Sequence, residues 1–376
     1  MKNIQMVDLR AQFEQIEEEI NQAIQGVLSS TAFINGPEVK LFAAELEAYT
    51  GAKHVIPCGN GTDALQIAMM ALGFQPGQEV IVPTFTYVAT VEVIALLGLK
   101  PKFIDVLPGT FELDPSQLEK VIGPNVVGIV PVHLYGQCSN MEVILNFAEK
   151  HGLKVIEDTA QAIGASYTFS DGKKMQAGTM GHVGTTSFFP SKNLGCYGDG
   201  GAMFTNDSEL AEKLRMIANH GQKRKYYHDS IGVNSRLDTL QAAILRVKLP
   251  HLDRYSASRN QVAEKYDLAF KNHPNIQIPE RAANSTHVFH QYTVKIKNAS
   301  RDELKAFLQE NGVPSMVYYP VPLHLQKAYL DYGYQRGDFP VAEQLCEQVL
   351  SFPIHTEMNF EEQDYIISTI LNFFQP

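Results

Sequence analysis

Short apolar runs alternate with segments of helical period between about residues 49 and 206. The apolar positions of one such segment, residues 140–152, recur three and four residues apart, at Met141, Ile144, Leu145 and Ala148. Alternating strands and amphipathic helices are typical of a mostly parallel sheet with crossover helices. The pattern therefore predicts an α/β fold, with strands at residues 80–83, 102–106, 126–134, 153–157, 185–189 and 202–205.

The pattern changes after a long helical stretch that is broken at Pro250. A strand, a helix, a further strand and two C-terminal helices follow, the first three at residues 288–297, 301–311 and 314–319. The last helix opens with Asn359 and Glu362, at the spacing of a capping box. We therefore expect two domains: residues 1–250, a large α/β domain that includes the N-terminal helical segment, and residues 251–376, a small C-terminal α+β domain.

Composition and charge narrow the classes of partner. The 376 residues include 31 Lys and Arg against 41 Asp and Glu, a formal net charge of −10, which argues against broad electrostatic binding of nucleic acid or anionic lipid. The sequence shows no signal-peptide pattern and no apolar stretch long enough to span a bilayer. We expect a cytoplasmic protein that binds small molecules, with no membrane, nucleic-acid or metal partner. Neither a disulfide framework nor a zinc ribbon is indicated by the scattered cysteines, Cys58, Cys138, Cys196 and Cys346.

A Gly-Asn-Gly-Thr turn at residues 59–62 joins a predicted strand to a predicted helix. Free amides of the first helical turn, the flexibility of Gly61 and the hydroxyl of Thr62 together suit a phosphate. The segment matches neither the Walker pattern nor the dinucleotide fingerprint. An ordinary capped helix, with Thr62 or Asp63 in its first turn, explains this segment equally well.

The strand at residues 153–157 is followed directly by Asp158, at the edge where ligands of open α/β sheets bind. Its carboxylate could hold a proton on a heterocyclic nitrogen, and Gln161 follows just beyond it. A cap or a turn is the commoner role for an aspartate at a strand end, so this position alone does not decide between the two.

A single lysine, Lys192, lies between a predicted strand and a glycine-rich stretch. Its apolar neighbours, among them Phe188, Phe189 and Leu194, can remove water from the amine, which lowers its pKa and favours formation of a Schiff base. An ordinary surface lysine is the alternative. The neighbouring glycines indicate that something approaches the backbone closely here.

Together these three segments contain the parts that pyridoxal phosphate needs. Its phosphate must be anchored, its ring nitrogen kept protonated and its aldehyde tethered to an amine. Tyr87, after another strand end, could stack on the ring, although an ordinary core aromatic is the commoner case. The combination predicts an enzyme that uses pyridoxal phosphate.

Seven motifs carry a resemblance to a known family: GNGTDAL (59–65), PTFTYVAT (83–90), EDTAQ (157–161), SFFPSKNLGCYGDGGAMFTND (187–207), HGQ (220–222), GVNSRLDTLQAAIL (232–245) and YYPVPLHLQ (318–326). Over nearly its whole length the chain resembles the DegT/StrS family of nucleotide-sugar aminotransferases. The resemblance implies a fold type I pyridoxal phosphate enzyme whose large domain binds the cofactor. It also implies a homodimer with active sites at the subunit interface.

The resemblance also implies roles for single residues. Lys192 would form the Schiff base and Asp158 would pair with the ring nitrogen, which makes these two the catalytic residues. The other implied cofactor contacts are Gln161 and Tyr87 at the ring and Gly61, Thr62, Ser187 and, from the other subunit, Asn234 at the phosphate.

Within the family, the chain resembles the members that aminate carbon 3 of a UDP-linked 2-acetamido-3-keto sugar, including the uluronate aminotransferases of surface-polysaccharide and O-antigen pathways. Glutamate is the expected amino donor. Arg236 would reach the neighbouring site and meet the substrate, because a guanidinium suits phosphate or carboxylate. Tyr318 and Tyr319 would lie near the sugar. His324 is assigned to the nucleotide region, with a structural loop histidine as the alternative.

Three rival functions stay open at this point. Amination at carbon 4, or of a dTDP-linked deoxy sugar, would need the same cofactor residues. A regulator could bind pyridoxal phosphate or a sugar nucleotide without turnover. A dinucleotide oxidoreductase would need a glycine fingerprint that the chain lacks.

Two further features have ordinary explanations. The basic run 223–225 is expected to be a solvated loop, with pyrophosphate binding across a dimer as the alternative. His287 and His290 lie three apart in a predicted strand, which would send them to opposite faces and disfavours a shared metal.

Overall fold

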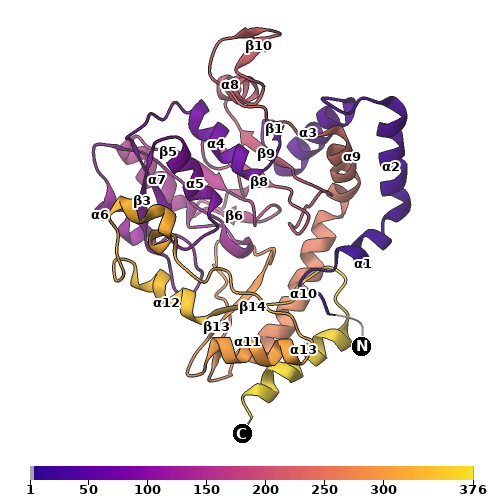
Figure 1. Cartoon of the computed structure of the whole chain (residues 1–376), viewed down its shortest axis with the longest axis vertical. Helices are drawn as coiled ribbons and strands as arrows, with labels where there is room; N and C mark the ends of the chain where they lie inside the picture. Colours follow the sequence, from indigo (N-terminus) through magenta and orange to yellow (C-terminus); the bar gives the residue numbers. More distant parts are fainter. Residues whose placement is uncertain (1–3, 376) are drawn as a thin grey trace.

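The computed structural model describes residues 4–375. A seven-stranded sheet forms the centre of the larger part of the molecule (Figure 1). In spatial order its strands are β1 (His54–Cys58), β9 (Gly201–Thr205), β8 (Val183–Ser187), β5 (Lys154–Asp158), β4 (Val126–Ile129), β2 (Glu79–Pro83) and β3 (Lys100–Ile104). Strands β8, β5, β4, β2 and β3 run parallel, and only β9 runs against its neighbours. The predicted α/β fold with a mostly parallel sheet is confirmed.

The middle of this sheet is buried on both faces. Val80 and Val82 of β2 pack into one core with helices α4, α5 and α8, whereas Ile81 between them packs into another core with α7. Strands covered on both sides read as continuous apolar runs, which is why β2 was visible in the sequence. The helices of this part are α1 (Leu9–Glu14), α2 (Glu17–Ser30), α3 (Pro37–Thr50), α4 (Gly61–Ala71), α5 (Ala89–Leu96), α6 (Leu118–Val121), α7 (Met141–His151), α8 (Ser208–Ala218) and α9 (Thr239–Lys248).

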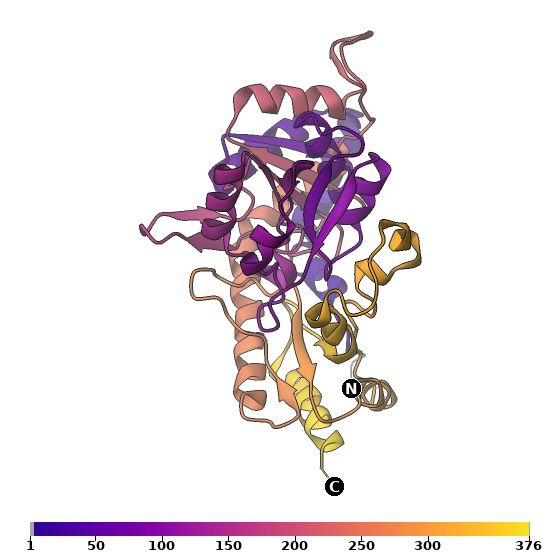
Figure 2. The ribbon, with the colours of Figure 1, turned by 90° about the vertical axis from the view of Figure 1, so that its left-hand side faces the viewer.

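A second, smaller layer lies below the large sheet in Figure 2. Its antiparallel sheet consists of β12 (Ile276–Gln277), β13 (Tyr292–Ile296) and β14 (Val349–Phe352). Around it lie the C-terminal helices α10 (Leu252–Phe270), α11 (Arg301–Glu310), α12 (Pro340–Gln348) and α13 (Phe360–Phe373). Side chains of α10, α11 and α13 form a core with this sheet.

The chain beyond residue 250 contributes to the core of the small antiparallel sheet and also to a core of the large sheet. Leu323, Tyr329, Phe339 and Leu345 are buried with the core that covers β2 on the α4 side. The division into residues 1–250 and 251–376 therefore stays a prediction.

Two small hairpins and five 3₁₀ turns complete the fold. The hairpin of β10 (Gln222–Arg224) and β11 (Tyr227–His228) projects from the body in both views (Figures 1 and 2). It contains the basic run 223–225, which is exposed. The other hairpin pairs β6 (Ser166–Thr168) with β7 (Lys174–Gln176), and the 3₁₀ turns are Pro115–Gln117, Leu134–Gly136, Leu249–His251, Leu323–Leu325 and Lys327–Tyr332.

Several local predictions are confirmed. Gly152 ends α7 in the left-handed region at φ 67°, and the capping box of Asn359 and Glu362 opens α13. At Pro250 the helical stretch is interrupted by a 3₁₀ turn between α9 and α10. Within residues 4–375, none of the helices combines the length and hydropathy that crossing a bilayer requires.

One predicted strand starts later than expected, and another is absent from the described residues. Strand β13 begins only at Tyr292, because Phe289 adopts a left-handed backbone conformation at φ 44° that a strand does not accommodate. Residues 314–319 form no strand and make a single bridge, between Met316 and Ser351. Pro314, and Pro320 just after the segment, lack the amide that a ladder needs, so pairing is restricted there.

Candidate active site

The carboxyl ends of β1, β2, β5 and β8 lie at one edge of the large sheet. Strands β2, β5 and β8 belong to its parallel part, and β1 points the same way because β1 and β8 are both antiparallel to β9. Ligands of open α/β sheets bind at this edge. A cavity of about 670 Å³ opens there, lined by residues that follow these strands.

The cavity brings together most of the residues that the sequence predicted for the site. Nine of the twelve line it: Gly61, Thr62, Tyr87, Asp158, Gln161, Ser187, Lys192, Tyr318 and Tyr319. The other three, Asn234, Arg236 and His324, are not among its lining residues.

One end of the cavity is the N-terminus of α4. Asn60 caps the helix, its side chain accepting a hydrogen bond from the Asp63 amide at 2.8 Å. A Cβ atom on Gly61 would lie 2.8 Å from the Cβ of Ser187, so only glycine lets the helix start this close to the end of β8. First-turn amides, the helix dipole and two hydroxyls, those of Thr62 and Ser187, make this end suited to a phosphate.

Asp158, the last residue of β5, is held by two donors. Its Oδ2 accepts from the Thr90 hydroxyl at 2.9 Å and its Oδ1 from the Ala160 amide at 3.1 Å. The carboxylate is only 6% exposed and faces the cavity. Each carboxylate oxygen has a second lone pair, so Asp158 can still accept a hydrogen bond from a protonated ring nitrogen.

Lys192 lies in the loop after β8. Its backbone amide donates to the Phe189 carbonyl at 2.8 Å, whereas its side-chain amine makes no hydrogen bond or ion pair within the described part of the chain. Burial lowers the pKa of its amine to about 8, and the nearby Asp158 carboxylate opposes that shift. A lysine with a lowered pKa offers an uncharged amine near neutral pH, which is the form that attacks an aldehyde.

The glycines around this lysine allow the chain to approach itself. A Cβ on Gly195 would lie 2.3 Å from the Pro190 carbonyl oxygen, and one on Gly201 would lie 2.4 Å from the carbonyl carbon of Asn60. The close approach that the sequence indicated is therefore made, at these two positions, by the chain's own backbone.

Gln161 is fixed at both ends of its amide. Its Oε1 accepts from the Tyr135 amide at 2.7 Å, and its Nε2 donates to the Tyr319 hydroxyl at 3.2 Å. Tyr87, 6.2 Å from Tyr319 between ring centroids, is 54% exposed, so it is not a core aromatic. Tyr318 is tied to Tyr135, whose hydroxyl donates to the Tyr318 carbonyl. These contacts make one aromatic wall of the cavity.

The segment with Asn234 and Arg236 is joined to the site through the residue between them. The Ser235 hydroxyl donates to Asp63 at 2.6 Å and accepts from the Gly59 amide at 2.9 Å. Arg236 lines a separate cavity of about 410 Å³ beside α3 and β1. Neither Asn234 nor Arg236 reaches the large cavity of its own chain.

His324 does not belong to the cavity lining. It is fully buried, with Nδ1 at 2.8 Å from the Thr84 hydroxyl and Nε2 at 3.2 Å from the Glu343 carboxylate. Both ring nitrogens are thus occupied by its own chain. The assignment to the nucleotide region is corrected to the alternative, a histidine with structural hydrogen bonds.

Sequence reasoning missed part of the cavity lining. Thr86, His290 and Gln291 line it, and each carries a buried side-chain atom without a hydrogen-bond partner in the described structure. The prediction that His287 and His290 lie within a strand is wrong, because β13 starts at Tyr292. No local pattern pointed to His290, since its place in the cavity depends on a turn at Phe289.

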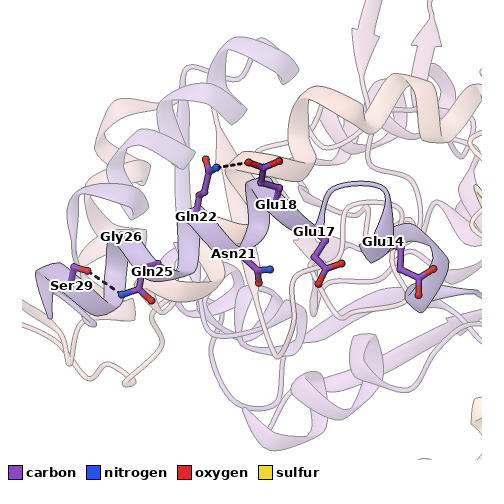
Figure 3. A pocket seen from close by; sticks show the side chains of 8 residues that line it. All are labelled: Glu14, Glu17, Glu18, Asn21, Gln22, Gln25, Gly26 and Ser29. Atoms are coloured by element: carbon purple, nitrogen blue, oxygen red, sulfur yellow. Dashed lines mark hydrogen bonds between the residues drawn. The ribbon is translucent and has the colours of Figure 1, made fainter.

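A different hollow runs along the exposed face of α1 and α2 (Figure 3). Its side chains are three carboxylates and uncharged polar groups, from Glu14, Glu17, Glu18, Asn21, Gln22, Gln25 and Ser29. Within it, Gln22 donates to Glu18 and Gln25 to Ser29. It is open to solvent, and none of its lining side chains is basic.

The large cavity has one group for each reactive part of pyridoxal phosphate. Lys192 suits the aldehyde, Asp158 the ring nitrogen, and the N-terminus of α4 the phosphate. Because Gly61 has no side chain, the first-turn amides of α4 are accessible from the cavity. The residues present therefore fit this cofactor.

Comparison with known proteins identifies relatives along the whole chain. Residues 14–371 match the DegT/DnrJ/EryC1/StrS aminotransferase family. A pleiotropic regulatory protein of Geobacillus stearothermophilus is 48% identical, over 99% of each chain. The UDP-2-acetamido-2-deoxy-3-oxo-D-glucuronate aminotransferase of Pseudomonas aeruginosa is 47% identical, over 98% of this chain and 100% of that protein. The dTDP-3-amino-3,4,6-trideoxy-alpha-D-glucose transaminase of Streptomyces venezuelae is 42% identical, over 93% and 91%.

Solved structures show the same fold. A DegT DnrJ EryC1 StrS aminotransferase from Brucella abortus superposes with a TM-score of 0.93 at 43% identity, over 99% and 100% of the two chains. NtdA from Bacillus subtilis, solved with the bound cofactor PMP, has a TM-score of 0.88 at 33% identity, over 95% and 82%. The chain belongs to the DegT/DnrJ/EryC1/StrS aminotransferase family, and it is a pyridoxal phosphate-dependent sugar aminotransferase of fold type I.

Proposed function

We propose that this enzyme transfers an amino group from glutamate to the 3-keto carbon of a UDP-linked 2-acetamido-2-deoxy keto sugar or uluronate, for the biosynthesis of cell-surface polysaccharide. The observation that carries the chemistry is the meeting of Lys192, Asp158 and the N-terminus of α4 in one cavity. The substrate rests on the 47% identity to an aminotransferase named for a UDP-linked 3-oxo sugar.

When bound, pyridoxal phosphate supplies an aldehyde that accepts an amine and a ring that withdraws electrons from the bond next to it. The α4 amides with Thr62 and Ser187 would hold the phosphate. Asp158 would hold the proton on the ring nitrogen, and Thr90 and Ala160 fix the position of its carboxylate. Tyr87 and Gln161 would contact the ring.

Lys192 has two tasks. It would tether the cofactor between turnovers. Once displaced by an amino substrate, its free amine would move a proton to and from the substrate carbon. Since burial lowers its pKa to about 8, roughly a tenth of the displaced amine is uncharged at pH 7 and can accept the proton, far more than for a lysine with its usual pKa. The same lysine serves both half-reactions, so we expect ping-pong kinetics.

The proposal includes a homodimer in which Asn234 and Arg236 complete the site of the other subunit. Arg236 makes no ion pair within residues 4–375 and lines its own cavity, which leaves its guanidinium available. Ser235, hydrogen-bonded to Asp63, couples the position of these two residues to the phosphate end of the large cavity. Tyr318 and Tyr319 would contact the sugar.

Two measurements test this function. The first is the visible absorption spectrum of the purified enzyme before and after glutamate, with Lys192→Ala beside it. We expect a violet band that glutamate moves toward the ultraviolet and that the variant lacks. The second is NMR of the product formed from a panel of 3-keto and 4-keto sugars linked to UDP or dTDP. Amination at carbon 4, or of dTDP sugars only, would replace the proposed substrate with the rival one.

A regulator without turnover is a rival that the sequence leaves open, and the chain is 48% identical to a protein named as a pleiotropic regulatory protein. The intact set of Lys192, Asp158 and Ser187 in one cavity favours catalysis. A spectrum that responds to glutamate would exclude the non-catalytic alternative, and a cofactor band that no amino donor changes would favour it.

A further inference from the structure

Residues 287–291, the His290 segment, enter the cavity just before β13 begins. His290 and Gln291 both line the cavity that holds Lys192, and His290 is only 6% exposed. Neither residue has a part in the proposed chemistry described above. The way the fold holds this segment indicates what the two side chains do.

Two asparagines fix the first half of the His290 segment. Asn260 of α10 donates from Nδ2 to the His287 carbonyl at 2.8 Å. Asn193, next to the catalytic lysine, donates from Nδ2 to the Val288 carbonyl at 2.9 Å. The loop that carries Lys192 and the His290 segment are therefore joined directly, and a shift in one would move the other.

A buried arginine fixes the second half. Arg259 of α10 is 2% exposed and has no carboxylate partner within residues 4–375; its Nη1 donates to the carbonyls of Phe289 at 3.1 Å, His290 at 3.2 Å and Ile354 at 3.1 Å. Burial lowers the pKa of this guanidinium to about 10. Burying a charge without a counter-ion is unfavourable. The hydrogen bonds that hold the segment are therefore formed despite the free-energy cost of burying the guanidinium.

The backbone itself is strained at the centre of the segment. Phe289 has φ 44°, a left-handed conformation that is uncommon for a residue with a Cβ atom. Gly136 approaches so closely that a Cβ there would lie 2.8 Å from the Phe289 amide nitrogen. Strain that persists because its surroundings impose it concentrates at functional sites.

The side chains of the segment are not satisfied in the same way. His290 Nδ1 and Gln291 Oε1 are buried without a hydrogen-bond partner in the described structure, and so is Thr86 Oγ1 in the same cavity lining. Buried polar atoms of native proteins are nearly always partnered. The fold thus secures the backbone of the His290 segment and leaves buried polar atoms of His290 and Gln291 for a ligand.

The charges around His290 decide which ligand groups fit. Burial, Lys192 and Arg259 all lower its pKa, and Tyr319 and Asp158 line the same cavity. A neutral imidazole and a side-chain amide each offer a donor and an acceptor. A carboxylate accepts only, whereas a hydroxyl or a secondary amide matches both kinds of atom.

We propose that His290 and Gln291 are specificity-determining residues that hydrogen-bond uncharged hydroxyl or acetamido groups of the keto sugar. This inference rests on the proposed function and names the groups of the substrate that the cavity recognises. The carboxylate of the amino donor is not their ligand, so these residues act in the second half-reaction and not in the first.

The test compares holoenzyme variants in binding and in each half-reaction. The probe is UDP-N-acetylglucosamine, which carries hydroxyl and acetamido groups but no keto group, so its dissociation constant is measured by calorimetry without turnover. His290→Phe keeps the ring shape and removes both nitrogens, and we expect binding about tenfold weaker, the usual effect of a lost neutral hydrogen bond. The glutamate half-reaction, followed by absorption, should stay within about twofold.

A second variant and a control protect the test from folding artefacts. His290→Asn restores a donor and an acceptor, and it should recover most of the binding that His290→Phe loses. His273→Phe removes an imidazole that packs against Phe374, with ring centroids 4.7 Å apart, outside the cavity lining, and should change neither half-reaction. Thermal unfolding of each variant shows whether it is folded.

Two outcomes would overturn the inference. The first is unchanged binding of the probe by both His290→Phe and Gln291→Leu. The second is an equal loss in both half-reactions together with a shifted pH midpoint of the cofactor absorption, which would mean that His290 acts on Lys192. A wild-type enzyme that aminates no keto sugar would refute the proposed function instead, and the binding comparison would still decide the role of His290.

Discussion

Two lysines, the half-buried Lys192 after β8 and the buried Lys248 at the end of α9, share one electrostatic property and differ in their partners. Burial lowers the pKa of each amine to about 8. Lys248 donates to the Gly195 carbonyl at 2.6 Å and lies 5.3 Å from the centre of the Tyr197 ring. Lys192 has no such partner within the described residues and lines the cavity.

The difference shows what makes a lysine a catalytic candidate. A lowered pKa makes an amine nucleophilic, but a hydrogen bond to a carbonyl engages that amine and holds it away from a ligand. Lys248 also supports the other lysine, because Gly195 lies three residues beyond Lys192 in the same loop. One lysine is available for chemistry and the other positions the loop that carries it.

The largest effect is expected from removing the available lysine. Lys192→Ala should lower turnover by about 10³-fold or more, because both the tether and the proton-transferring amine are lost. Single-turnover rates with glutamate measure this. Addition of a small primary amine should restore part of the rate, and a variant with turnover near wild type would remove Lys192 from the mechanism.

The second largest loss of turnover is expected from replacing Asp158, the carboxylate proposed to pair with the ring nitrogen. Asp158→Asn keeps the shape and an oxygen for the Thr90 hydroxyl, so the cofactor should still bind, but turnover should fall about 10²-fold because the ring is no longer held protonated. Equilibrium dialysis and steady-state rates separate the two effects. Full activity of this variant would contradict the assignment.

An effect of intermediate size is expected of pH on the rate of cofactor capture. The Lys192 amine titrates near pH 8 in the folded protein, so the rate at which apoenzyme captures pyridoxal phosphate should rise about tenfold per pH unit up to that value and then level off. Stopped-flow mixing from pH 6 to 9 measures this. Lys248→Met should leave the midpoint unchanged, and a midpoint that moves would mean that the two lysines titrate together.

The change of stability with pH has the same sign for both lysines, so it does not distinguish them. In the unfolded chain a lysine titrates near its usual pKa, about 10.4, and above pH 8 the unfolded state therefore binds more protons than the folded one. Both lysines accordingly add stability as pH rises from about 8 toward 10.4.

The smallest effect on catalysis is expected from the supporting lysine. Lys248→Met should lower the free energy of unfolding by about 1–3 kcal/mol, since the Gly195 carbonyl loses its partner, while turnover per folded molecule stays within about twofold. Denaturant unfolding and active-site titration measure these quantities. A hundredfold loss of turnover in a fully folded variant would show that the supporting role is catalytic after all.

Much of the site was predictable because its signals are local. Short sequence runs identified the strand ends, the Gly-Asn-Gly-Thr turn and Lys192. The hydrophobic period and residue types of such runs depend only on neighbouring positions in the chain. Parallel strands then bring their carboxyl ends to one edge, so Asp158 and Lys192 meet as predicted from topology. Tyr318 and Tyr319, by contrast, were placed by family resemblance.

What the sequence by itself determined is the α/β pattern, the helix caps and the residues of the cofactor motifs. The tertiary structure alone decided that His324 is satisfied by Thr84 and Glu343, that Lys248 binds a carbonyl, and that His290 faces the cavity. The partners of these side chains lie tens to hundreds of residues away in sequence. No local period encodes such contacts, because they arise only when separate elements pack and exclude water from between them.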